Sequence, residues 1–189
     1  PPPPPPPPPP PFFFQAADGI RALVRSRGLG DVYKRQWQYI KRAVEDGSDR
    51  TARWEMMMAS TEGALAFVKG LGAVHSMSHA AGRLKELRLH HGTLNAVILP
   101  TVLRFNESTC SETYGRLRQA MGLPPNADLA SEIEQLNADI GLPGSLSEMG
   151  LSEDLIEDMV PHAVSDLATM TNPKKVRAED YVELYKLAM

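Results

Sequence analysis

From Trp37 to the C-terminus, apolar residues recur at intervals of three and four positions, which is typical of helices that bury one face. This pattern predicts eight helices, over about 37–45, 51–69, 73–87, 91–105, 111–121, 127–140, 152–170 and 178–187. The sequence shows no convincing stretch with the alternating pattern of a strand, and no internal repeat. We therefore predict an all-α fold.

Capping and helix-breaking residues mark the ends of the predicted helices. The predicted start signals are Thr109 or Ser111, Asp128, Ser152 and the segment 177–180, and the predicted stop signals are Gly122, Gly141, Pro143 and Gly144. Pro100 lies inside the fourth predicted helix, although a proline lacks the backbone donor and clashes with the preceding turn. We therefore predict a kink or a local break at Pro100.

Residues 1–36 differ in composition from the rest of the chain. The run Pro1 to Pro11 can form only an extended polyproline helix without backbone donors, which would suit a partner of the SH3 or WW type. Alternatively, the proline run and Phe12 to Phe14 are translated homopolymer nucleotide tracts, and SRGLGDVYKRQ (26–36) resembles an artefact at the ends of translated assembly fragments. We favour the artefact, and we predict that residues 1–36 are artefactual or disordered and that 37–189 form one helical domain.

Composition and charge narrow the functional classes. A hydrophobic content of 42% can form a sizeable core, and 20 basic against 23 acidic residues without a long charged run predict no nucleic-acid or membrane partner. The only cysteine, Cys110, excludes an intramolecular disulfide framework and fits a reducing compartment. Because we also find no long apolar run and no signal-peptide pattern, we expect a cytoplasmic protein.

The candidate chemistry lies in the histidines, four of which fall between His75 and His91. His75 and His79 share one helical face, and His91 opens the next predicted helix, where its imidazole can return to the first two. Imidazole nitrogens are good ligands for iron or zinc. The ordinary alternative is a set of partly buried histidines that hydrogen-bond their neighbours, but the small residues around them leave room for a metal, and we favour the metal site.

Other enzyme classes fit these residues less well. A zincin protease needs H-E-x-x-H, whereas Ser76 follows His75 here, and no G-x-S-x-G elbow follows a strand. A metalloenzyme built on a helical bundle would need the Glu-x-x-His spacing. Glu62 and Glu86, the nearest candidates, do not have it.

The segments GLGAVHSMSHAAG (70–82) and HHGTLNAVILPTVLRFN (90–106) resemble the signature region of the iron-containing (group III) alcohol dehydrogenases. In that family, G-x-x-H-x-x-x-H precedes H-G-x-x-N-A-x-x-L-P. The resemblance extends upstream and downstream and covers nearly all of 37–189. It implies the C-terminal helical, metal-binding domain of the dehydroquinate synthase-like fold.

The resemblance also implies a site. Members of the family bind Fe²⁺, in some cases Zn²⁺ or another divalent metal, through an aspartate and three histidines. His75 and His91 match the last two of these histidines, and His79 matches a histidine associated with the cofactor and with proton transfer. The match is imperfect, because the spacing of His75 and His91 is about two residues longer than usual and His90 stands where proline is common. His90 therefore remains an alternative ligand, although the His91-Gly92 pair favours His91.

The implied activity needs more than these residues. The resemblance implies an enzyme that interconverts an alcohol with its aldehyde or ketone by hydride transfer, with NAD or NADP bound by an N-terminal half. The sequence leaves the oligomeric state of the intact enzyme open, with a homo-oligomer as one candidate. Neither a nucleotide-binding half nor the D-A-x-x-H segment with the other two ligands occurs in these 189 residues, so we expect a truncated product without catalysis of its own. The alternative is a non-catalytic helical interaction module with a proline-rich arm.

Overall fold

The structure is a computed structural model that describes residues 28–66 and 70–189. Its helices are α2 (Gly28–Glu45), α3 (Arg50–Ala66), α4 (Ala73–Ala81), η2 (Lys85–Leu87), α5 (His91–Met121), α6 (Leu129–Asp139), η3 (Glu153–Leu155), α7 (Ile156–Ser165), η4 (Leu167–Thr171) and α8 (Ala178–Ala188). The described residues contain no strand, which confirms the all-α prediction. No helix within them is long and apolar enough to cross a membrane.

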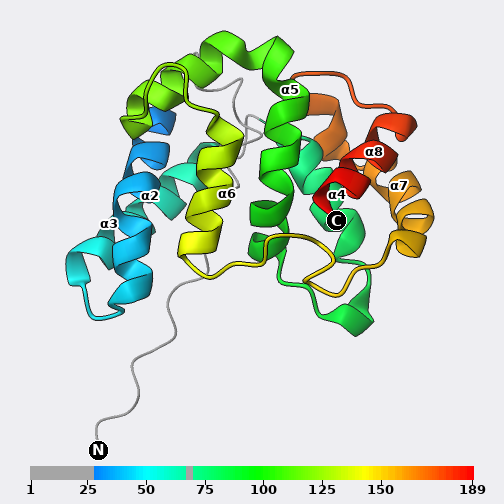
Figure 1. The fold of residues 1–189 in the computed structure, drawn as a ribbon, viewed down its shortest axis with the longest axis horizontal. Helices are drawn as coiled ribbons and strands as arrows, with labels where there is room; N and C mark the ends of the chain where they lie inside the picture. Colours follow the sequence, from blue (N-terminus) through cyan, green and yellow to red (C-terminus); the bar gives the residue numbers. More distant parts are fainter. Residues whose placement is uncertain (1–27, 67–69) are drawn as a thin grey trace, which may run out of the picture.

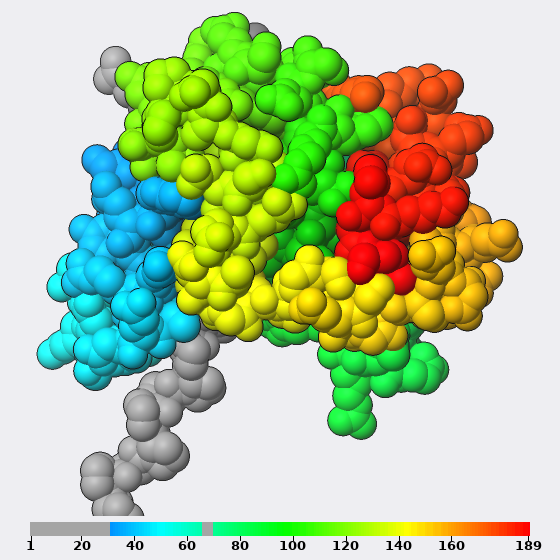
Figure 2. All heavy atoms as spheres, viewed as in Figure 1, coloured from blue at the N-terminus to red at the C-terminus, as the bar shows by residue number. Residues whose placement is uncertain are grey.

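The long helix α5 runs through the centre of the domain (Figure 1). Helices α2 and α3 pair with each other, and α2 and α6 pack on one side of α5. Helices α4 and α8 pack on the other side, where α7 contacts both of them. Figure 2 shows α6 and α8 lying along α5 at the surface. The core therefore forms around α5, and α4 is held between α5 and α7.

Helix α2 begins earlier than the helix predicted from Trp37. It starts at Gly28, and Val32, Tyr33 and Gln36 are buried in the domain. Charged residues alternate with these buried positions, so the segment is amphipathic like the helix that follows. The predicted boundary at residue 37 thus lies inside α2, whereas the proline run lies outside the described residues.

Helix α4 is shorter than predicted. It ends at Ala81 with Gly82 as its cap, and a separate turn of helix, η2, follows. Arg88 then adopts a left-handed conformation with φ 48°, which reverses the chain direction. The predicted continuous helix over 73–87 was wrong, because Gly82 weakens the helix and the chain turns there. This turn brings His91 back toward α4.

Helix α5 is continuous through Pro100, so of the predicted kink or local break the break was wrong, as was the new start at Thr109 or Ser111. The missing backbone donor of Pro100 would leave the carbonyl of Ala96 without its usual helical partner. The side chain of Asn137, from α6, donates a hydrogen bond from Nδ2 to that carbonyl at 2.9 Å. A tertiary contact therefore replaces the lost helical bond.

The segment 152–170 is not one helix, as predicted, but η3, α7 and η4 in succession. Asp166 is extended, with φ −69° and ψ 135°, and it ends α7 and begins η4. Its Oδ1 accepts a hydrogen bond from the Ala168 backbone at 2.8 Å, which caps η4. The break places η4 against α4, beside the predicted site.

Other predicted ends are confirmed. Asp128 caps α6 by accepting hydrogen bonds from two backbone N–H groups, and at the start of α8 the Asp180 carboxylate accepts a hydrogen bond from the backbone N–H of Arg177 at 2.8 Å. Gly122 ends α5 in the left-handed region, with φ 74°. Gly141 is also left-handed, directly after α6 and its cap.

Candidate metal centre

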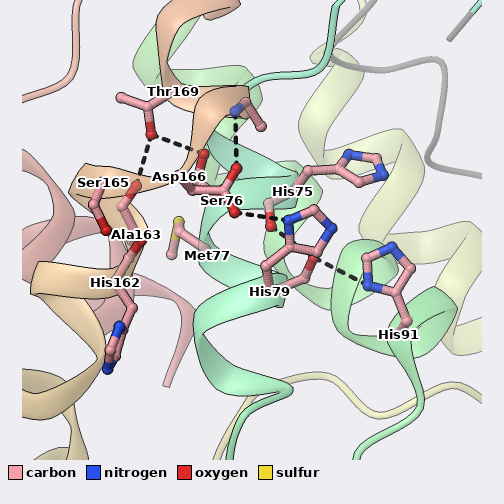
Figure 3. A network of polar contacts seen from close by, with 12 residues as sticks. His75, Ser76, Met77, His79, His91, His162, Ala163, Ser165, Asp166 and Thr169 are labelled. Carbon is pink, nitrogen blue, oxygen red and sulfur yellow. Dashed lines mark hydrogen bonds and ion pairs between the residues drawn. The ribbon is translucent and has the colours of Figure 1, made fainter.

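The three predicted site histidines lie together (Figure 3). His75 and His79 come from consecutive turns of α4, and His91 is the first residue of α5. The ring centroids lie 5.2 Å apart for His75 and His91, 5.6 Å for His75 and His79, and 5.2 Å for His79 and His91. His75 is 1% exposed, whereas His79 and His91 reach the surface. The spacing in the sequence therefore becomes one cluster of imidazoles.

The N-terminal end of α4 is fastened by a buried amide. Asn172, in the segment after η4, accepts a hydrogen bond at Oδ1 from the Ala73 backbone at 3.1 Å. The Asn172 side chain also pairs reciprocally with that of Asn106 on α5, at 2.9 and 3.2 Å. This clamp joins α4, α5 and the C-terminal segment, so it fixes the helix that carries His75 and His79.

Hydrogen bonds determine which ring nitrogen of His91 carries the proton. The Ser78 hydroxyl donates to the carbonyl of His75 at 3.1 Å, so its oxygen is left to accept from Nδ1 of His91 at 3.4 Å. On the other side of the ring, Asn95 Nδ2 lies 3.1 Å from His91 Nε2 and can only donate. Both contacts assign the proton to Nδ1 and leave a lone pair on Nε2.

Asn95 also connects the two candidate ligands. The same Nδ2 lies 3.5 Å from Nε2 of His75, so the Nε2 atoms of His75 and His91 converge on one donor. The Oδ1 atom of Asn95 is buried without a hydrogen-bond partner. Two imidazole lone pairs directed at one region fit half of a metal centre, and Ser78 supplies the kind of outer hydrogen bond that orients such ligands.

The electrostatic environment keeps His91 neutral. Partial burial, followed by the neighbouring His75 and His79, lowers the pKa of His91 to about 4. Its imidazole is thus available as a ligand at neutral pH. No group of three or more His, Cys, Asp or Glu in residues 28–66 and 70–189 is arranged to hold a metal ion, so a metal centre at the two candidate imidazoles would need further ligands.

The other two histidines near the candidate ligands, His90 and His79, hydrogen-bond to different partners. His90 is the N-cap of α5, and its Nδ1 accepts from the Thr93 backbone at 3.3 Å, so its side chain is engaged in capping. His79 Nδ1 lies 2.9 Å from Oδ2 of Asp166. Sequence reasoning missed Asp166, because 87 positions separate it from His79 and only the break between α7 and η4 brings the two together.

The fold and the histidine cluster indicate the class of protein to which the chain belongs. It is an all-helical domain that carries half of a candidate metal site built from histidines. The sequence profile described as "Fe-containing alcohol dehydrogenase family, C-terminal" matches residues 36–189. The chain belongs to this family, as the resemblance predicted.

Individual relatives agree with this assignment. The chain is 46% identical over 166 residues to a 4-hydroxybutyrate dehydrogenase of Cupriavidus necator, covering 84% of this chain and 44% of that protein. It is 32% identical over 161 residues to an NAD-dependent methanol dehydrogenase of Bacillus methanolicus, covering 80% and 42%. A crystal structure of a 1,3-propanediol oxidoreductase superimposes with a TM-score of 0.82 at 28% identity, covering 92% and 51%. The chain spans less than half the length of the two curated relatives.

Proposed function

We propose that this chain is the C-terminal, metal-binding part of an NAD- or NADP-linked alcohol dehydrogenase that interconverts an alcohol with its aldehyde or ketone. The convergence of Nε2 of His75 and Nε2 of His91 on Asn95 is the observation that carries the proposal. Membership of the iron-containing family supplies the reaction class. It also disfavours the alternative of a non-catalytic helical module.

His75 and His91 hold Fe²⁺ in this proposal, with Zn²⁺ or another divalent cation as the alternative. A bound cation would act as a Lewis acid on the substrate oxygen, while nicotinamide carries the hydride. Within this chain, Ser78 orients His91. By its match to the family motif, His79 would lie on the cofactor and proton-transfer side. The aspartate, the third histidine and the nucleotide site belong to the upstream part of the relatives.

For the substrate, we favour a short hydroxy acid. The relative with 46% identity is named a 4-hydroxybutyrate dehydrogenase, whereas relatives named for methanol or 1,3-propanediol are 32% and 34% identical. The assay is kcat/KM of the enzyme containing this chain on 4-hydroxybutyrate, methanol and 1,3-propanediol. A preference for methanol or the diol would overturn the substrate assignment without affecting the metal assignment.

Metal affinity tests the proposal itself. Two imidazoles alone should bind Fe²⁺ or Zn²⁺ weakly, and joining the chain to an upstream half with the other two ligands should tighten binding at least about 100-fold. His75→Ala should remove this gain, whereas His162→Ala should keep it, because His162 lies on α7 outside the ring cluster. Equal affinity with and without the upstream half would contradict the proposal.

A further inference from the structure

Asp166 uses its two carboxylate oxygens for two different contacts. Oδ1 accepts from the Ala168 backbone at 2.8 Å and so caps η4. Oδ2 lies 2.9 Å from Nδ1 of His79, on the neighbouring helix α4 (Figure 3). The side chain of Asp166 is 22% exposed, so solvent competes only partly for these oxygens. The capping contact is structural, whereas the contact with His79 reaches the histidine cluster.

The contact determines the state of the His79 ring. An ionised carboxylate can only accept hydrogen bonds, so Nδ1 of a neutral His79 must carry the proton. Nε2 then has a lone pair on the side of the ring away from Asp166. Among the residues that the structure describes, no hydrogen bond to this Nε2 is found. The ring plane is also restrained, because it stacks on that of His91 with an angle of 16°.

We propose that Asp166 is a positioning residue that fixes the tautomer of His79, so that Nε2 presents an acceptor to a bound hydroxyl group. The choice of a hydroxyl ligand rests on the proposed function, in which the substrate is an alcohol. With the opposite tautomer, Nε2 would be a donor and would lack the lone pair that an alcohol O–H requires. Asp166 therefore acts through His79 and does not itself touch the ligand.

One substitution separates the two contacts of Asp166. In Asp166→Asn, the amide carbonyl replaces Oδ1 and still accepts from the Ala168 backbone, so the cap on η4 remains. The amide NH₂ replaces Oδ2 and can only donate to Nδ1 of His79. Nδ1 must then carry the lone pair and Nε2 the proton. The variant thus reverses the tautomer without removing the cap.

The measurement is a long-range ¹H–¹⁵N spectrum of the histidine rings in the full 189-residue chain, at about pH 9, where an ordinary histidine is neutral. The His79 signals are those missing from His79→Gln. In the unmodified chain we expect a protonated Nδ1 and an unprotonated Nε2, and in Asp166→Asn the two signatures should exchange. Asp158→Asn removes the same charge from an exposed position on α7 and should leave the spectrum of His79 unchanged.

Two outcomes would overturn the proposal. One is a proton on Nε2 of His79 in the unmodified chain, which needs no variant and so does not depend on whether Asp166→Asn folds. The other is an unchanged tautomer in a folded Asp166→Asn chain, because a purely structural role would leave the ring signals where they are. Neither outcome involves a metal or the upstream half, so failure here is distinct from failure of the metal-affinity test above.

Discussion

Replacing Asn137 by alanine tests how α5 continues through Pro100. The helix has no N–H at this position for the carbonyl of Ala96, and Nδ2 of Asn137 donates to that carbonyl instead, at 2.9 Å. Ala96 is fully buried and Asn137 is 5% exposed, so the Ala96 carbonyl lies away from bulk solvent. Asn137→Ala should therefore leave a buried carbonyl unpaired.

The expected loss follows from two opposing contributions. An unsatisfied buried acceptor costs about 1–3 kcal/mol. The Oδ1 atom of Asn137 is itself buried without a partner, and removing it relieves part of that cost. We expect the free energy of unfolding to fall by about 2 kcal/mol, measured by urea denaturation. Asn126→Ala, at an exposed position, is the matched control and should change the free energy by less than about 0.5 kcal/mol.

A second substitution isolates the hydrogen bond from the packing of Asn137. Pro100→Ala restores a backbone N–H that can donate to the carbonyl of Ala96. In this background, Asn137→Ala should cost about 1 kcal/mol less than in the unmodified chain. An equal cost in both backgrounds would refute the explanation, because it would show that the amide of Asn137 does not substitute for the missing donor.

Three other predictions concern the rest of the domain. Asn172→Ala leaves the buried donors of Ala73 and Asn106 unpaired and should cost about 2–4 kcal/mol in urea denaturation; a loss below about 1 kcal/mol would contradict the clamp. His91 has an unfolded pKa of 6.5 and a folded pKa of about 4, so the unfolded state binds more protons as pH falls through this window. The free energy of unfolding should fall as the pH is lowered from 6.5 to about 4, and it should fall less in His91→Gln. Identical pH profiles of the two proteins would count against the depressed pKa. A chain beginning at residue 37 should be about 3 kcal/mol less stable than one beginning at 28, because it lacks the buried Val32 and Tyr33, and equal thermal midpoints would show that this part of α2 does not contribute.

Local patterns allowed much of the fold to be predicted. Helical periodicity located the main helices, because it reports which face each segment buries, and the caps at Asp128 and Gly122 depend on neighbours in the sequence. The contact between His75 and His79 also follows from helix geometry, since the two are four positions apart. The approach of His91 followed from a predicted helix start directly after a turn, which the structure places at the predicted residue.

The missed features depend on contacts between distant segments. Nothing near Pro100 indicates that Asn137 replaces its missing donor, because α6 supplies that residue from 37 positions further along. The prediction of one helix over 152–170 was wrong for a similar reason. Asp166 leaves the helical conformation where η4 meets α4, and this contact is not visible in the local sequence. A periodic pattern shows that a segment is amphipathic, but it does not show which side chain of another helix completes a hydrogen bond.

The most direct test of the central claim is the iron content of the enzyme in which this chain is joined to its upstream half, measured together with alcohol oxidation. His75→Ala and His91→Ala should each lose iron and turnover together, because each removes an imidazole that converges on Asn95. His90→Ala should keep both, since His90 caps α5. Loss in His90→Ala with retention in His91→Ala would move the ligand by one residue. Retention of iron in both His75→Ala and His91→Ala would contradict the metal assignment.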